Sequence, residues 1–487
     1  MLEEKIKEKP EGLTAKAWRL AERAHAGQKR LSGEPYFSHC VAAAEQLAAW
    51  GMDEETVAAG LMHDVLEDTK MTIEEIKREL GAEVTVLVAG VTKISQIGHR
   101  ATRAREAVSP IMSEQAEKLR KLILSLGQDV RIALVKLADR LHNMKTLSFL
   151  PQAKRVRIAT ETVEIYAPLA YRLGMRKLSG ELEDLSFPQM APRVYEQLVK
   201  RVAKRYGERE RYLQKVKPIV EKAVIEAGIN GAKLSFRAKR YLSLYKKLKH
   251  YSNNLDQIHD LVAFRVMVPT VEDCYRALGV IHSLWTPMTG RIKDYISNPK
   301  PNGYRSLHTT VVGEDRVPVE FQIRTPEMHE EAEYGVAAHW LYKQLTPEER
   351  RRNAARLAEE AAWARKLSGW QESAEAGQSP VEAFKVNFLR DRVFVMTPKG
   401  RVEEMPAGAT PVDFAYRVHS TLGHEAAGAK VNGVMVPLSH KLVTGDVVEI
   451  LRQKGKQPSE DWLGFIATTS ARDHIRNAIN RKRKRLG

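Results

Sequence analysis

The spacing of apolar residues changes along the chain, and this change limits the fold more than any other feature of the sequence. Between residues 13 and 185, apolar side chains recur every three or four positions, as at Ala15 and Trp18, which is the period of an amphipathic helix. After Gly228 and Gly231, short apolar runs and alternation replace that period, which is typical of strands. The 487 residues therefore predict a multidomain protein that begins with an all-α domain.

The strand-like part of the sequence predicts two further domains. Apolar runs at 261–268, 307–312 and 317–323 predict a mixed sheet, which helices at 242–248 and 271–284 would cover. The expected order is a helical domain at 1–190, a polar helical connector at 191–232, a mixed-sheet α+β domain at 233–345, an exposed linking helix at 346–385, a small α+β module at 386–452, and the start of a helical region with a basic tail at 453–487.

Charge and cysteine content narrow the partners and the compartment. The chain has 78 Lys and Arg against 61 Asp and Glu, and the net charge of +17 suggests polyanionic partners such as nucleotides or RNA. Cys40 and Cys274 are too few and too far apart for a disulfide framework, so a reducing compartment fits best. With no signal peptide and no long apolar run, the sequence predicts a cytoplasmic protein without membrane contact. The basic tail at 481–485 is either a solubilising end or an RNA contact.

Polar side chains in the first third of the chain form a candidate metal site. One group is spaced for a single side of a helix: His63, Asp64, Glu67 and Asp68. A face of a second predicted helix carries Asp139, Asn143 and Thr146, and His39 lies at the expected start of a third.

Two imidazoles and two carboxylates from these segments would make a mixed nitrogen and oxygen site. Such a set suits a borderline divalent ion, manganese, iron or zinc, and leaves positions open for water. The alternative is that His63 and Asp64 are a helical dipeptide whose hydrogen bonds are satisfied in the core. Three matching segments favour the metal site.

These segments resemble the HD-type metal-dependent phosphohydrolases, and more narrowly the hydrolase domain of bifunctional RelA/SpoT-type proteins. The resemblance implies removal of pyrophosphate from the 3′ position of the alarmone (p)ppGpp, with Mn²⁺ as the metal. It implies the metal ligands His39, His63, Asp64 and Asp139. It also implies a water-activating pair, Glu67 and Asp68, and nucleotide contacts at Arg30, Ser32, Asn143 and Thr146. Leu31 stands where the family usually has a basic residue.

A second candidate site lies in the predicted mixed-sheet domain. Cations and a hydroxyl gather at a strand-to-helix passage, where helix N-terminal amides also favour phosphate: Arg237, Lys239, Ser243 and Lys247. A solvated basic face is the alternative for this segment. Alternation over 317–324 would turn Glu320, Gln322 and Arg324 to one face of a strand, toward a nucleotide. An ordinary half-exposed strand is the competing interpretation.

Two neighbouring segments add to this site. Asp260, just before an apolar run, would supply a second carboxylate for Mg²⁺. The turn at 300–308 carries an aromatic surface for stacking, Tyr304, between Asn302 and His308.

The region from Arg237 to about 340 resembles the (p)ppGpp synthetase domain of the same family, which is similar to nucleotidyltransferases. The family reaction moves pyrophosphate from ATP to the 3′-hydroxyl of GDP or GTP and releases AMP. The resemblance implies Mg²⁺ ligands at Asp260 and Glu320, with Glu320 also the base for the hydroxyl. It implies nucleotide binding by Arg237, Lys239, Ser243, Lys247, Lys293, Lys300, Asn302, Tyr304, His308 and Gln322, with Tyr304 stacked on the acceptor guanine.

The basic sequence Arg291-Ile-Lys293-Asp294 resembles that of bifunctional members, whereas synthetase-only relatives are acidic here. Without that resemblance, Arg291 and Lys293 would be a surface charge pair. The segment 391–450 resembles the TGS domain, a small ubiquitin-like fold, which implies contact of His419 with uncharged tRNA on the ribosome. Longer members continue into a zinc-finger-like region and an ACT-type domain, and we expect this chain to lack both.

The sequence therefore predicts a bifunctional alarmone synthetase and hydrolase of the stringent response. Because both activities together would consume ATP without net product, we expect nucleotide at one site to disfavour the other, through the connector and the linking helix. Two alternatives stay open: a hydrolase whose synthetase-like domain only senses nucleotide, and a noncatalytic binder of tRNA or the ribosome.

Overall fold

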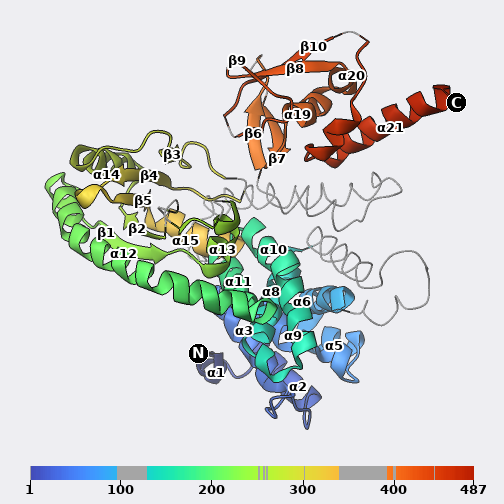
Figure 1. Cartoon of the computed structure of the whole chain (residues 1–487). Helices are drawn as coiled ribbons and strands as arrows, with labels where there is room; N and C mark the ends of the chain where they lie inside the picture. The colour runs from blue at the N-terminus through green and yellow to red at the C-terminus, as the bar shows by residue number, and fades with distance from the viewer. Residues whose placement is uncertain are drawn as a thin grey trace. The chain divides into compact units, whose positions relative to one another are not determined.

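The computed structural model describes residues 2–95, 129–250, 253–255, 258, 261–300, 302–338, 392–398, 402–443, 445–453 and 455–486. They fall into two compact units, divided between Glu372 and Ser373. The expected linking helix at 346–385 and Asp260 lie outside the described residues. Figure 1 shows the elements of both units.

The first part of the chain is helical, as predicted. Its helices are α1 (Leu2–Glu8), α2 (Leu13–Ala24), α3 (Phe37–Ala49), α4 (Glu54–Met62), α5 (Val65–Asp68), α6 (Ile73–Ser95), α8 (Val130–Lys145), α9 (Gln152–Glu161), α10 (Ala167–Arg172) and α11 (Arg176–Met190). Helices α3 and α4 pack closely because Gly60 has no side chain: a Cβ there would lie 2.5 Å from Leu47 Cδ1 and 3.3 Å from Ala44 Cα. This approach brings the start of α3 near the end of α4.

The prediction that His63 and Asp64 share one helix with Glu67 and Asp68 is wrong. Helix α4 ends at Met62, α5 begins at Val65, and His63 and Asp64 form the turn between them. The turn is stable because the backbone carbonyl of Asp64 accepts from the amides of Glu67 and Asp68 at 3.0 and 2.9 Å.

The expected mixed sheet has five strands in the order β1-β2-β5-β4-β3, in which only β2 and β5 are parallel neighbours. The strands are β1 (Lys233–Ala238), β2 (Val262–Met267), β3 (Lys293–Asp294), β4 (Leu307–Val312) and β5 (Pro318–Arg324). Helices α13 (Tyr241–His250), α14 (Val271–Leu284) and α15 (Pro326–Tyr334) complete this region. The predicted strand at 307–312 and helix at 271–284 are confirmed.

The polar stretch at 193–226 is the single long helix α12 (Pro192–Glu226), but it is not only a connector. Its apolar stripe, which includes Val216, Val220 and Val224, is buried in one core with Phe264 and Phe321 of the sheet. Polar residues outnumber that narrow stripe, so composition alone suggested an exposed helix. Helix α12 therefore covers one face of the sheet and leaves the opposite face for a site.

The helical part and the sheet part meet at the turn between α10 and α11. The amide of Val336 donates to Leu173 O at 2.8 Å, and Asn302 Nδ2 donates to Tyr171 O at 3.2 Å. Gly335 has φ +55°, and a Cβ there would lie 2.0 Å from Leu173 O. The two backbones approach this closely only because residue 335 is glycine.

The C-terminal unit is a small α+β fold, as predicted. Its elements are β6 (Arg392–Met396), β7 (Val402–Pro406), α19 (Pro411–Val418), α20 (Ser420–His424), β8 (Ala426–Val431), β9 (Val434–Val436), β10 (Val448–Arg452) and α21 (Thr469–Leu486). Thr410 and Asp413 form a capping box at α19, and the Asp413 carboxylate also accepts from the amides of Ala467 and Thr468. One buried aspartate thus ties α19 to the segment that leads into α21.

Replacing Gly335 with alanine should loosen the contact between the α10–α11 turn and the sheet part. A left-handed φ and a clash with Leu173 O together should cost about 1–3 kcal/mol, which a drop in the first thermal unfolding midpoint would show. Gly207→Ala is the matched control, because a Cβ at this helical position meets nothing within 4 Å. We expect the control to be neutral or slightly stabilising. An unchanged midpoint for Gly335→Ala would contradict the close approach.

Candidate active sites

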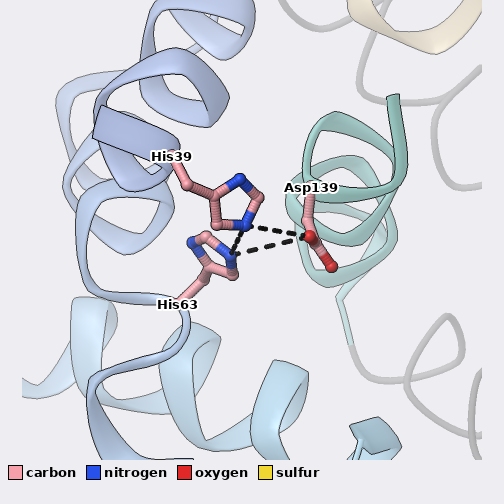
Figure 2. A group of neighbouring side chains, drawn as sticks. All are labelled: His39, His63 and Asp139. Carbon is pink, nitrogen blue, oxygen red and sulfur yellow. Dashed lines mark hydrogen bonds and ion pairs between the residues drawn. The ribbon is translucent and has the colours of Figure 1, made fainter. Parts of the chain in front are cut away.

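Three of the four predicted metal ligands converge at the centre of the helical part. One ligand atom each from His39, His63 and Asp139 lies within 4.8 Å of the other two, and all three side chains are buried. Figure 2 shows both imidazoles directed at the carboxylate. His39 Nε2 lies 3.3 Å from His63 Nε2 and 3.3 Å from Asp139 Oδ1. Asp64 Oδ2 is 3.0 Å from His63 Nε2 and 3.5 Å from His39 Nε2, so the four side chains lie together, and we call them the metal cluster after their predicted role.

The hydrogen bonds on the far side of each ring turn both Nε2 atoms toward the carboxylates. His63 Nδ1 is 2.8 Å from Gly60 O and must donate to it. His142 Nδ1 accepts from Arg30 NH1 at 3.0 Å, so it accepts from His39 Nδ1, 2.7 Å away. Each imidazole therefore carries a proton on Nδ1 and directs Nε2 at the carboxylates, where a metal ion would take the place of an Nε2 proton.

The charges around the cluster also fit a cation. Burial raises the pKa of Asp64, but the charge of His63 and hydrogen bonds from both imidazoles hold it well below its usual range. Burial likewise raises the pKa of Asp139, but Lys136, with Nζ 2.6 Å from Oδ2, and hydrogen bonds from both imidazoles together hold it well below its usual range. Burial lowers the pKa of His63, but Asp64 and Asp139 together raise it well above its usual value. Two ionised carboxylates thus favour positive charge here, and the donor set fits a divalent metal ion.

The predicted water-activating and nucleotide residues lie around this cluster. Glu67 and Asp68 are both exposed on α5, and Asp68 Oδ2 accepts from the Tyr36 hydroxyl at 2.8 Å. Arg30 NH2 donates to Asn143 Oδ1 at 2.9 Å, and Asn143 in turn donates to Asp139. Two predicted contacts lie further out: Ser32 Oγ contacts Glu34, and Thr146, which follows the end of α8, donates to His142 O.

Sequence reasoning missed His142 and Tyr36. His142 is one helical turn from Asp139, and this spacing could have predicted that both lie at the same site. Burial, His39 and Arg30 lower its pKa to about 4, so it stays a neutral acceptor. No spacing rule links Tyr36 to Asp64, because their contact is tertiary.

The predicted nucleotide-binding residues of the sheet part line one cavity of about 340 Å³. We call it the cationic pocket, because eight Lys or Arg residues and a single carboxylate, Glu320, are among the described residues that line it. The predicted residues in its lining are Arg237, Lys239, Ser243, Lys247, Arg291, Lys293, Lys300, His308, Glu320 and Gln322. Sequence reasoning missed Arg176, Arg240, Tyr295 and Thr310. So much positive charge suits a polyphosphate.

Strand register explains why residues far apart in sequence meet in this pocket. Lys293 pairs with His308, His308 with Gln322, and Gln322 with Arg265, so four neighbouring strands present one polar row. Gln322 connects the row to the carboxylate, since its Nε2 donates to Glu320 Oε1 at 2.9 Å. The predicted alternation of β5 therefore holds for Glu320 and Gln322, whereas Arg324 is buried and is not among the residues that line the pocket.

Tyr304 and Asn302 differ from the other predicted residues because they lie behind the cavity lining. Tyr304 is 2% exposed, and its hydroxyl donates to His308 Nε2 at 2.8 Å. The guanidinium carbon of Arg176, at the start of α11, lies 4.1 Å from the centre of the Tyr304 ring. Asn302 accepts from the Tyr304 amide and donates to Tyr171 O. In this conformation a cation from the helical part covers the predicted stacking ring.

His419 in the C-terminal unit is exposed and lies between α19 and α20. Its Nδ1 accepts from the Thr421 amide at 3.2 Å and so caps α20. The outer ring edge stays available to a partner. In the described part of the chain, no helix is both long and apolar enough to cross a membrane.

Three family models match the chain in succession. They are an HD domain at residues 17–176, the region found in RelA / SpoT proteins at 236–346, and a TGS domain at 393–452. The first match contains the metal cluster, and the second contains most of the cationic pocket.

The chain is also similar to curated proteins over nearly its whole length. A GTP pyrophosphokinase of Myxococcus xanthus is 45% identical over 469 residues, which cover 96% of this chain and 60% of that protein. The chain therefore combines the region found in RelA / SpoT proteins with an HD and a TGS domain. A guanosine-3′,5′-bis(diphosphate) 3′-pyrophosphohydrolase of Aquifex aeolicus is 44% identical over 96% of this chain and 65% of its own length. The chain thus spans less than two thirds of either relative.

Among solved structures, the small alarmone synthetase 2 of Bacillus subtilis matches 35% of this chain and 98% of its own. Its identity is 24% and its TM-score 0.25, which supports no conclusion about either site.

Stability should fall with acid because of His329 on α15. Burial, Arg324 and Arg265 lower its pKa to about 4 from 6.5, so the unfolded chain takes up this proton first as the pH falls. The stability that depends on neutral His329 is fully present above about pH 6.5 and is lost progressively as the pH falls toward 4. His329→Gln should therefore lose less stability between pH 7 and pH 5 than the unsubstituted chain, measured by urea unfolding at both values. Equal losses would contradict the lowered pKa.

Proposed function

We propose that the chain is a bifunctional guanosine alarmone enzyme. One activity transfers pyrophosphate from ATP to the 3′-hydroxyl of GDP or GTP and gives (p)ppGpp and AMP. The other hydrolyses (p)ppGpp to GDP or GTP and pyrophosphate. The observation that supports both is that one chain holds two separate sites of different chemistry: a buried group of imidazoles and carboxylates that could hold a metal ion, and a cationic pocket around one carboxylate.

For hydrolysis, we propose that His39, His63, Asp64 and Asp139 hold Mn²⁺. A divalent ion held by these ligands would polarise a water molecule and make it easier to deprotonate. Glu67 and Asp68, on the short helix that begins directly after Asp64, are the groups that take the proton. Arg30, Ser32, Asn143 and Thr146 bind the nucleotide, and Leu31, 73% exposed in the same loop, adds no charge there.

For synthesis, we propose that Glu320 accepts the proton of the 3′-hydroxyl and, with Asp260, holds Mg²⁺. A cluster of basic side chains with one hydroxyl binds ATP phosphates and compensates the charge that develops on the bridging oxygen: Arg237, Lys239, Ser243, Lys247, Lys293 and Lys300. Neutral His308 and Gln322 order the acceptor side. Burial, and after it Lys300, hold the pKa of His308 well below its usual range, so it accepts from Tyr304 instead of repelling a bound cation.

The alternative of a hydrolase with a merely sensory pocket is less well supported. Glu320 is hydrogen-bonded within the cationic pocket, which a site without catalysis would not need. A noncatalytic tRNA or ribosome binder leaves both sites unexplained. The proposal also includes contact between tRNA and the exposed His419, and a cytoplasmic location. Its domain boundaries lie at residues 190, 232, 345, 385 and 452.

Single substitutions should separate the two activities. Glu320→Gln should lower synthesis by at least about a hundredfold and leave hydrolysis intact, because it removes one base while the amide keeps the hydrogen bond with Gln322. Asp64→Asn should do the reverse. The assay follows ppGpp and AMP formed from ATP and GDP with Mg²⁺, and GDP and pyrophosphate formed from ppGpp with Mn²⁺. Loss of both activities in either folded variant would contradict a two-site enzyme.

We further propose that α11, rather than the connector and the linking helix that we expected from the sequence, carries the reciprocal control. Helix α11 places Arg176 on the Tyr304 ring, and the turn before it holds Leu173 against Val336. While Arg176 covers the ring, guanine cannot stack on it, so acceptor binding requires α11 to move. Acceptor binding would thus act on the helical part through the side chain of Arg176.

Arg176→Met should make acceptor binding easier. Removing the cation from the ring should lower the KM for GDP several-fold, because the base no longer displaces a cation–π contact worth about 1–2 kcal/mol. Lys177→Met is the matched control, since it removes a charge from the adjacent exposed position. The control should keep the KM of the unsubstituted chain. A higher KM in Arg176→Met alone would mean that Arg176 binds the acceptor, and would overturn this model of control.

A further inference from the structure

The Tyr36 hydroxyl lies between two carboxylates of the metal cluster region. It is 2.8 Å from Asp64 Oδ2, a proposed metal ligand, and 2.8 Å from Asp68 Oδ2, a proposed proton acceptor. We propose that Tyr36 is a positioning residue for hydrolysis, which fixes the proton-accepting carboxylate of Asp68 relative to the metal ligand Asp64. This inference rests on the proposed hydrolase function and assigns Tyr36 no contact with substrate.

The loop that carries Tyr36 is built to hold the hydroxyl in place. Lys29 and Pro35 form an antiparallel bridge, and the Tyr36 amide donates to Gln28 O at 2.9 Å. The Tyr36 ring stacks on His25, with centroids 4.9 Å apart and planes 23° from parallel. Neither contact involves the hydroxyl, so the ring stays in position whether or not the hydroxyl binds the carboxylates.

A second contact ties the same loop to α5. Gln28 Nε2 donates to Asp68 O at 2.7 Å, and its Oε1 lies 2.7 Å from His25 Nδ1. The backbone of Asp68 is therefore held by Gln28, whereas its carboxylate, on an exposed residue, is directed inward by Tyr36. Without the hydroxyl, the exposed carboxylate would gain free rotation toward water.

Electrostatics explains why a phenol suits this position. The carboxylates of Asp64 and Asp68 both lie next to the Tyr36 hydroxyl, and two carboxylates on either side of one atom repel each other. A neutral hydroxyl offers one proton that either oxygen accepts, so it reduces the repulsion without adding a charge that would compete with the metal ion.

The test is Tyr36→Phe, which removes one hydroxyl and keeps the ring on His25. We expect kcat for ppGpp hydrolysis to fall about 10–100-fold, as when outer partners of metal ligands are removed, with KM nearly unchanged. Mn²⁺ affinity, measured without substrate from the EPR signal of free Mn²⁺, should weaken as well. Synthesis by the same variant should be unaffected, which also shows that it is folded.

Tyr275→Phe is the matched control, because it removes a tyrosine hydroxyl from Asp294 at 2.9 Å in the sheet part. It should leave hydrolysis and Mn²⁺ affinity unchanged. The inference is overturned if Tyr36→Phe keeps both kcat and Mn²⁺ affinity, or if it raises only KM, which would make Tyr36 a nucleotide contact. If the unsubstituted chain itself hydrolyses no ppGpp, the proposed function fails instead, and the Mn²⁺ measurement still decides whether Tyr36 supports the metal ligand.

Discussion

The contact between the α10–α11 turn and Gly335 is the constraint on which both sites depend. Helix α11 begins immediately after this turn, places Arg176 in the cationic pocket and pairs Asp184 with Arg240, the residue just before α13. Its other neighbours include α8, the helix that carries Asp139. One helix therefore borders both the metal cluster region and the pocket, so a shift of its first turn cannot leave either unchanged. The glycine at 335 makes this approach possible, since any side chain would hold the backbones apart.

The two sites differ in the charge of the side chains that line them. Around the metal cluster, two ionised carboxylates and two imidazoles present the donor atoms that a bound cation would use. In the cationic pocket, guanidinium and ammonium groups repel one another until a polyphosphate enters. Each site is thus less stable empty than filled, so its ligand stabilises the folded chain as well as reacting in it. The residues of the two sites come from separate parts of the sequence, so each site has its own set of charged side chains.

The sequence predicted what depends on local periodicity. The alternation of Glu320 and Gln322 followed directly from strand geometry, and the family resemblance brought His39, His63 and Asp139 together correctly. Prediction failed where tertiary contacts decide. The break after Met62 depends on hydrogen bonds of His63 and Asp64 that no helical period reveals. Likewise, Arg176 lies far in sequence from the pocket it enters, and only the docked turn explains its presence there.

The two cysteines have a practical consequence. Cys40 and Cys274 are both buried and free, and burial raises the pKa of each thiol to about 12. Thiols of that kind react slowly with maleimides, because the thiolate is the reacting species. The two cysteines of the unsubstituted chain therefore take up very little label. Cysteines introduced singly on the exposed sides of α11 and α15 would carry the only reactive dyes, and energy transfer between them would follow the junction as nucleotides bind.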